Sequence, residues 1–474
     1  MRDYINLGII VLLAVVFWYI PVPSGLTEHA WHLFIIFIAT IVAIIFKPLP
    51  LGALITLSIS SACLTGVLTI QDALSAYGKP IVWLILFAFF IAQALTLTGL
   101  GQRISYHILA RFGRSPLGLA YSFVLTDLIL APAIPSNTAR GGGIIYPIIR
   151  SLINAFDGNR VTPDKKGALG PFLIKSAFQA NIITSTMFLT AIAGNPFAAD
   201  FAAQQGIELS WGKWALAGSL PGLICLALIP VIIYPFLKPE KLESVDARQM
   251  AKKELGHMGP MDQKQKILSF IFAGLLLMWA GGASYGIHAT LAAMIGIVLL
   301  VMAKVISWDD MIKEKSAWNT FVWFGALIMY AHEISKSGII DWFGAGVADL
   351  VATQSPVMAF VIISAVYFYT HYFFASTTAL ISTMFGVFLA VLINKGIDGF
   401  QAAMTLAAFS CLSSCITHYG TGSAPVYFGG NYLTVKTWWK IGFVLGLFYI
   451  VVWWGVGSLW WQLLGLGTSP FLMG

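Results

Sequence analysis

The chain has 474 residues, of which 58% are hydrophobic and 10% are charged, and its mean hydropathy is +0.83. A soluble protein carries roughly 25% charged residues, so this composition excludes a soluble fold and predicts that most of the surface faces lipid. The net charge of +7 is spread over short loops without an interleaved aromatic and basic face, which excludes nucleic acid as a partner.

The apolar runs predict eleven transmembrane helices, because each run with its flanks is long enough to cross a hydrocarbon layer of about 30 Å. Segments that alternate like β-barrel strands are absent, so helices are the expected spanning elements. The eleven helices are expected at residues 5–22, 30–46, 50–69, 80–99, 170–193 (with a continuation to about 204), 212–236, 266–282, 287–306, 319–338, 402–432 and 440–465.

Two segments, 116–152 and 356–394, are left over, and each contains one short polar motif. The first motif is Ser136-Asn137-Thr138 and the second is Ser376-Thr377-Thr378. Pro132, Pro135 and the glycines at 141–143 argue against a straight crossing. We therefore predict two re-entrant hairpins with their tips at the motifs, although residues 357–375 are long enough to span by themselves.

The two motifs also mark an internal repeat. Ser136 lies 53 positions after Trp83, and Ser376 lies 53 positions after Trp323, so an offset of 240 residues relates the two halves. Five predicted crossings separate the two tryptophans, and an odd number reverses the direction of the chain. The sequence thus predicts two inverted repeats, 30–237 and 266–466, with an extra first helix in 1–29 and a cytoplasmic linker at 238–265.

The distribution of basic residues supports this topology with the N-terminus in the cytoplasm. Of the 27 lysines and arginines, 22 fall on the inside and Arg140 lies at a hairpin tip. The outside receives the remaining four: Lys79, Lys213, Lys336 and Lys395. The first residues show neither a cleavable signal nor a transit leader, which favours a bacterial inner membrane.

Polar breaks inside hydrophobic helices are typical of transporter binding sites. A helix that starts at a motif directs its positive dipole end at the break, and the hydroxyl and amide groups add donors that fit a carboxylate. Two further breaks are expected to complete the pocket through Asn195, Pro196, Thr421, Gly422, Ser423 and Pro425. The alternatives are polar side chains that only satisfy a kinked backbone and ordinary proline kinks.

These motifs resemble those of the divalent anion/sodium symporter family over nearly the whole chain. The closest branch is that of the bacterial and plastid dicarboxylate exchangers, whose first motif runs on into Ala-Arg and glycine, as Ala139-Arg140-Gly141 does here. The resemblance implies a homodimer with a scaffold and a mobile transport domain that moves as an elevator. It also implies that one substrate carboxylate lies near each tripeptide.

The second motif departs from the sodium-coupled members, which carry Ser-Asn-Thr in both halves. Here Thr377 replaces the amide, while Arg140 and His371 lie near the motifs as candidates for charge compensation. A dianion in the membrane needs opposite charge. If the protein supplies this positive charge permanently, the carrier without substrate is cationic, and its binding site moves across the membrane only slowly. The carrier must then bind a second substrate before it returns, which predicts exchange. The alternative is that Arg140 snorkels away from the site.

The sequence therefore predicts an all-α elevator-type carrier that exchanges dicarboxylates such as malate, 2-oxoglutarate or succinate without sodium. No cofactor or metal is expected, and no enzymatic activity is expected because the chain contains no H-E-x-x-H metal motif. A sodium-coupled di- or tricarboxylate symporter is the main alternative, and an anion channel is a remote one. The intramembrane acids Asp127 and Glu333 and the face of Cys411, Cys415 and His418 stay unassigned, with local pairing or packing expected.

Overall fold

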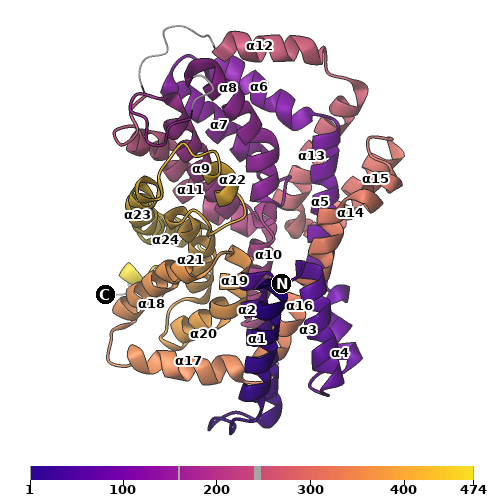
Figure 1. The fold of residues 1–474 in the computed structure, drawn as a ribbon, viewed down its shortest axis with the longest axis vertical. Helices are drawn as coiled ribbons and strands as arrows, with labels where there is room; N and C mark the ends of the chain where they lie inside the picture. The colour runs from indigo at the N-terminus through magenta and orange to yellow at the C-terminus, as the bar shows by residue number, and fades with distance from the viewer. Residues whose placement is uncertain (1, 158–160, 240–246, 473–474) are drawn as a thin grey trace.

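The computed structural model describes residues 2–157, 161–239 and 247–472, and within these residues the chain is helical with no β-strand. The first half contains α1 (Arg2–Trp18), α2 (Glu28–Phe46), α3 (Leu51–Leu64), α4 (Ile70–Leu74), α5 (Pro80–Leu97), α6 (Leu100–Phe112), α7 (Pro116–Leu130), α8 (Tyr146–Asp157), α9 (Leu169–Met187), α10 (Gly194–Gln204) and α11 (Trp211–Ile233) (Figure 1).

The second half of the described chain is also built from helices. These are α12 (Ala247–Met258), α13 (Gln263–Gly281), α14 (Ala289–Met302), α15 (Trp308–Lys313), α16 (Lys315–Lys336), α17 (Ile339–Leu350), α18 (Pro356–Thr370), α19 (Thr377–Leu380), α20 (Gly386–Asn394), α21 (Gly399–Leu412), α22 (Ala424–Phe428), α23 (Val435–Val452) and α24 (Ser458–Leu463).

Among the described residues, eight helices are long and apolar enough to cross a membrane. Two of them, Pro356–Phe373 and Thr377–Asn394, are the arms of the predicted second hairpin. The predicted spans at 50–69 and 287–306 are the shorter helices α3 and α14, with 14 residues each. The all-helical membrane architecture is thus confirmed, while the exact number of crossings stays a prediction.

Three helices that the apolar runs did not predict lie at the ends of the molecule. Figure 1 shows α6 and α12 at one end and α17 at the other. α12 falls within the predicted linker 238–265, of which residues 240–246 lie outside the described part. Arg103 of α6 fixes the chain that follows α12, because its guanidinium donates to the carbonyl oxygens of Met258 and Gly259 at 3.1 and 2.8 Å.

Both leftover segments turn back at their motifs. α7 and α18 have 15 residues each and start at Pro116 and Pro356, which the offset of 240 relates. After each tip the chain continues through a π-helix, η2 (Ala139–Ile145) or η6 (Ile381–Phe385), into α8 or α20. α18 packs against α20, as the arms of a hairpin do. The glycines at 141–143 lie inside η2 and do not break it.

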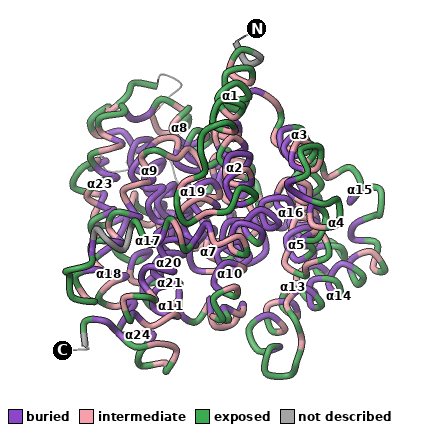
Figure 2. The backbone as a smooth tube through the Cα atoms, turned by 90° about the horizontal axis from the view of Figure 1, so that it is seen from below, coloured by how far each residue is buried: buried purple, intermediate pink, exposed green. Residues whose placement is uncertain are grey.

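The core lies around the two interrupted helices. Every residue of α9 is buried, and so is every residue of α21 after Gly399. Figure 2 shows this buried centre, whereas α1 is largely exposed. Pro80 starts α5 at a position where its missing N–H is harmless, and α5 packs against α14 and α16 as part of a frame beside this core.

Candidate functional site

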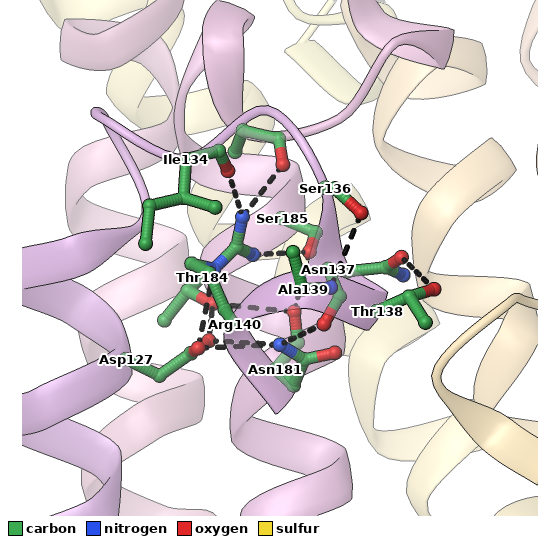
Figure 3. Close-up of polar contacts among 11 residues, drawn as sticks. Asp127, Ile134, Ser136, Asn137, Thr138, Ala139, Arg140, Asn181, Thr184 and Ser185 are labelled. Carbon is green, nitrogen blue, oxygen red and sulfur yellow. Dashed lines mark hydrogen bonds and ion pairs between the residues drawn. The ribbon is translucent and has the colours of Figure 1, made fainter. Parts of the chain in front are cut away.

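The serine of each motif caps the helix that follows it. Oγ of Ser136 accepts the amide N–H of Ala139 at 3.2 Å (Figure 3), and Oγ of Ser376 accepts that of Ala379 at 3.5 Å. Serine is a preferred N-cap residue because its oxygen satisfies an amide that the first turn leaves free. Each motif therefore lies at the positive end of a helix.

The tip of the first hairpin contacts the break between α21 and α22. The amide of Asn137 donates to Oγ1 of Thr421 at 2.7 Å, across 284 residues of sequence. At Gly422 a Cβ atom would meet Oγ1 of Thr138, so the absence of a side chain lets the break approach the tip. The predicted residues of the first motif and the second break are thus adjacent.

The tip of the second hairpin contacts both breaks. Oγ1 of Thr377 lies 3.2 Å from Oγ of Ser414, in the short helix η7 (Ser413–Ile416) at the end of α21. On its other side, a Cβ atom at Gly194 would lie 3.5 Å from Cγ2 of Thr377. Gly194 begins α10, after the short helix η3 (Leu189–Ala191). Two hairpin tips and two helix breaks therefore form one polar centre.

Arg140 is fully buried and forms an ion pair with Asp127, with Nε 3.2 Å from Oδ1. Its Nη1 donates to the carbonyl oxygens of Ile134 and Ala191 at 2.6 Å each, and Nη2 donates to Oγ of Ser185 at 2.7 Å (Figure 3). Arg140 does not snorkel away, but the pair carries no net charge. The hydrogen bonds of Arg140 therefore link the first hairpin to the break between α9 and α10.

His371 plays a similar part at the second break. Its Nε2 lies 2.7 Å from the carbonyl oxygen of Gly420, which can only accept, so this nitrogen carries the hydrogen. Its Nδ1 lies 2.9 Å from Oγ of Ser413. The ring is fully buried and joins the end of α18 to the break between α21 and α22.

The predicted site residues divide by accessibility. Ser136, Asn137, Thr138, Ser376 and Thr378 are partly exposed, and Gly422 and Pro425 are exposed. The other predicted residues are buried and support this surface from behind: Arg140, Asn195, Pro196, His371, Thr377, Thr421 and Ser423. Asn195, for example, donates to the carbonyl oxygens of Ser185 and Phe188 at 2.7 and 2.8 Å, and so caps the end of α9.

A cavity of about 530 Å³ opens beside the second tip. Ser376 and Gly422 line it together with the loop between α2 and α3. Lys47 of this loop is among the lining residues. The sequence reasoning did not include this loop, because a short Lys-Pro-Leu-Pro connection carries no local signal of a site.

Polar residues of α9 were also missed. Asn181 donates to both carboxylate oxygens of Asp127 and to the carbonyl oxygen of Asn137, at 3.2 to 3.3 Å. Thr184 donates to the same carboxylate, and Ser185 bonds Arg140. The spacing of Asn181, Thr184 and Ser185 by three and four residues puts them on one helix face, a signal that could have predicted the buried pair.

The residues left unassigned have local partners. Glu333 lies 4.0 Å from Lys336, and His418 accepts from Nε1 of Trp439 at 3.1 Å. The thiol of Cys411 contacts Oδ1 of Asn195, and that of Cys415 contacts the carbonyl oxygen of Gly442, both at 3.4 Å. In the described part of the chain, these groups do not come together as metal ligands.

Solved structures share the overall fold at low sequence identity. The transporter YdaH of Alcanivorax borkumensis aligns with a TM-score of 0.56 and 13% identity, over 99% of each chain. The antimetabolite efflux pump MtrF of Neisseria gonorrhoeae aligns with a TM-score of 0.56 and 14% identity, over 99% of this chain and 96% of the other.

Sequence relatives are much closer. YflS of Bacillus subtilis (strain 168), whose name mentions malate transport, is 46% identical over 98% of this chain and 97% of its own. Dicarboxylate transporter 1 of Spinacia oleracea chloroplasts is 42% identical over 96% of this chain and 80% of its own. The family described as the sodium:sulfate symporter transmembrane region matches residues 2–466. The chain is therefore a membrane-spanning member of the sodium:sulfate symporter family.

Proposed function

We propose that this protein exchanges dicarboxylates such as malate, 2-oxoglutarate and succinate across the bacterial inner membrane. The observation that carries the proposal is the convergence of two N-capped hairpin tips on two helix breaks, with a cavity beside the second tip. The hydroxyl and amide groups of Ser136, Asn137, Ser376 and Thr378 supply neutral donors for two carboxylates. The names of YflS and of the chloroplast relatives point to the same substrate class.

Sodium-independent transport is supported by the state of the backbone at the breaks. Sodium sites in transporters use carbonyl oxygens of unwound helices. Here Arg140 bonds the carbonyl oxygen of Ala191, Asn195 bonds that of Phe188, and His371 bonds that of Gly420. Protein donors thus occupy oxygens that a cation would need. The role of Arg140 in charge compensation stays a prediction. Because Arg140 is paired with Asp127, it would act by bonding a carbonyl oxygen that a sodium ion would otherwise bind, and not by adding net positive charge.

The proposed mechanism is an elevator built from two inverted repeats. α2 and α13 have 19 residues each, α3 and α14 have 14 each, and α7 and α18 have 15 each, which supports the repeat. α6 and α17 lie at opposite ends in Figure 1, as inversion requires. The moving unit would consist of the two hairpins, α9–α11 and α21–α24, and it would move against a frame made of α1–α5 and α13–α16. The carrier would be a homodimer with its N-termini in the cytoplasm.

One observation favours the sodium-coupled symporter as a second candidate, namely the family description itself. Labelled malate uptake into sodium-free proteoliposomes, loaded with unlabelled 2-oxoglutarate or with plain buffer, separates the two. We expect uptake only with internal dicarboxylate. Uptake that starts only when external sodium is added would identify a symporter, and conductance without saturation would identify a channel.

A further inference from the structure

The loop between α2 and α3, Lys47–Pro50, is a short strap that faces the second hairpin across the cavity. Lys47, Pro48, Leu49 and Pro50 all line the cavity together with Ser376 and Gly422. Among the described residues that line it, Lys47 carries the one charge. α2 also contacts α19, the helix that Ser376 caps.

The strap holds Lys47 in a defined conformation. Its backbone is left-handed, with φ 51° and ψ 48°, and its N–H donates to the carbonyl oxygen of Ala43 at 2.8 Å. Left-handed conformations are uncommon for residues other than glycine. Pro48 and Pro50 restrict the backbone on the following side. The backbone of Lys47 is therefore restrained, and the residue is exposed.

On the hairpin side of the cavity, the described lining residues include no unpaired cation. Ser376 and Gly422 are neutral, and the guanidinium of Arg140 is paired with Asp127 behind the first tip. His371 is fully buried, with both ring nitrogens bonded. A dianion that enters this cavity consequently meets Lys47 as its charged partner, and an ammonium–carboxylate hydrogen bond is stronger than a neutral one.

We propose that Lys47 binds one carboxylate of the entering substrate while the other approaches Ser376. This inference rests on the proposed dicarboxylate transport. Lys47 belongs to the frame, whereas Ser376 belongs to the hairpin unit, so the contact exists only while the cavity lies beside the strap. The affinity gained from Lys47 therefore differs between the two sides of the membrane. Lys47 contributes to binding of substrate that enters from the strap side, and it no longer contributes when the hairpins have moved away.

The chain offers a matched control. Lys304 is also exposed and left-handed, with φ 54°, and it lies one residue beyond the C-cap of α14, whereas Lys47 is itself the C-cap of α2. The predicted topology puts both lysines on the cytoplasmic side. α14 packs against α5 and α13, and Lys304 does not line the cavity. Asparagine tolerates the left-handed conformation, so Lys47→Asn and Lys304→Asn remove the charge without forcing the backbone to change.

The experiment measures the KM and kcat of malate exchange from each side, in proteoliposomes of known orientation. We expect Lys47→Asn to raise the strap-side KM about tenfold, the loss of one charged hydrogen bond, and to leave the opposite-side KM unchanged. Lys304→Asn should behave as wild type, and Lys47→Arg should restore most of the affinity. In Lys47→Asn the strap-side KM should also lose most of its dependence on ionic strength.

Two results would overturn the inference. Unchanged KM values on both sides in Lys47→Asn, with normal dicarboxylate exchange by the wild type, would remove Lys47 from binding and leave the proposed function intact. An equal rise of KM on both sides would show that the contact does not depend on the position of the hairpins. Failure of the wild type to exchange any dicarboxylate would instead reject the proposed function and this inference with it.

Discussion

At the scale of single residues, the buried ion pair of Arg140 and Asp127 is the feature most sensitive to change. Removing one partner of a buried pair leaves an uncompensated charge and costs about 3–5 kcal/mol. Both side chains are fully buried, so we expect Arg140→Ala to lower the melting temperature of the protein in detergent as well as abolish exchange. The sequence shows Asp127 and Arg140 only as separate polar residues, so this cost to stability could not be predicted without the fold.

The double variant Asp127→Asn with Arg140→Gln separates charge from position. Both changes keep polar side chains of similar size, and together they remove both charges. We therefore expect the double variant to recover much of the stability that Asp127→Asn and Arg140→Gln each lose alone. A double-mutant cycle on the melting data measures the coupling. Additive losses would show that the two side chains act independently in the folded protein.

Ser376 has a second testable role, because it both caps α19 and lines the cavity. Ser376→Ala loses the cap, at about 1 kcal/mol, whereas Ser376→Asp keeps a capping oxygen. The aspartate, however, brings a negative charge to a cavity meant for a dianion. We therefore expect Ser376→Asp to be the more stable variant and the less active one, as judged by melting and malate exchange. Normal exchange by Ser376→Asp would contradict a carboxylate site at this tip.

At the scale of elements, the contact between the first tip and the second break depends on Gly422. A methyl group there would push against Oγ1 of Thr138, so Gly422→Ala should separate α22 from the hairpin and raise the KM for malate at least about tenfold. At Gly143, which lies in the first hairpin together with Thr138, such a methyl group would have no other atom within 4 Å. Gly143→Ala should therefore exchange like the wild type. Equal behaviour of the two variants would show that the tip and the break need no close contact.

These elements show which parts of the site the sequence could predict. The motifs, their offset and the breaks are local patterns, so hairpin tips at Ser136 and Ser376 followed from proline, serine and periodicity. The partners could not be predicted, because Asn137 and Thr421 are 284 residues apart and no local rule pairs them. α6, α12 and α17 were missed for another reason: they are not among the long apolar helices, and the prediction relied on long apolar runs.

At the scale of the whole molecule, the elevator requires that the strap and the second hairpin separate during transport. Leu49 of the strap and Ala375 of the second hairpin line the same cavity. Cysteines at both positions, joined by a flexible bifunctional thiol reagent, should stop exchange while substrate binding is retained. The half-buried Cys63 is replaced by serine for this test, whereas the other three cysteines are buried.

A cross-link within the proposed moving unit is the matched control, because a rigid unit that moves as a whole tolerates an internal bond. A Cβ atom at Gly142 would lie 3.9 Å from Cβ of Val426, close to the mean of about 3.8 Å in disulfides. Gly142→Cys with Val426→Cys should therefore form a disulfide and keep exchange, with reductant making little difference. If this bond also stopped exchange, the first hairpin and α22 would have to move relative to each other, and transport would not be a rigid-body elevator. If the strap cross-link left exchange unchanged, the cavity wall would be fixed, and access would instead be controlled by the hairpins alone.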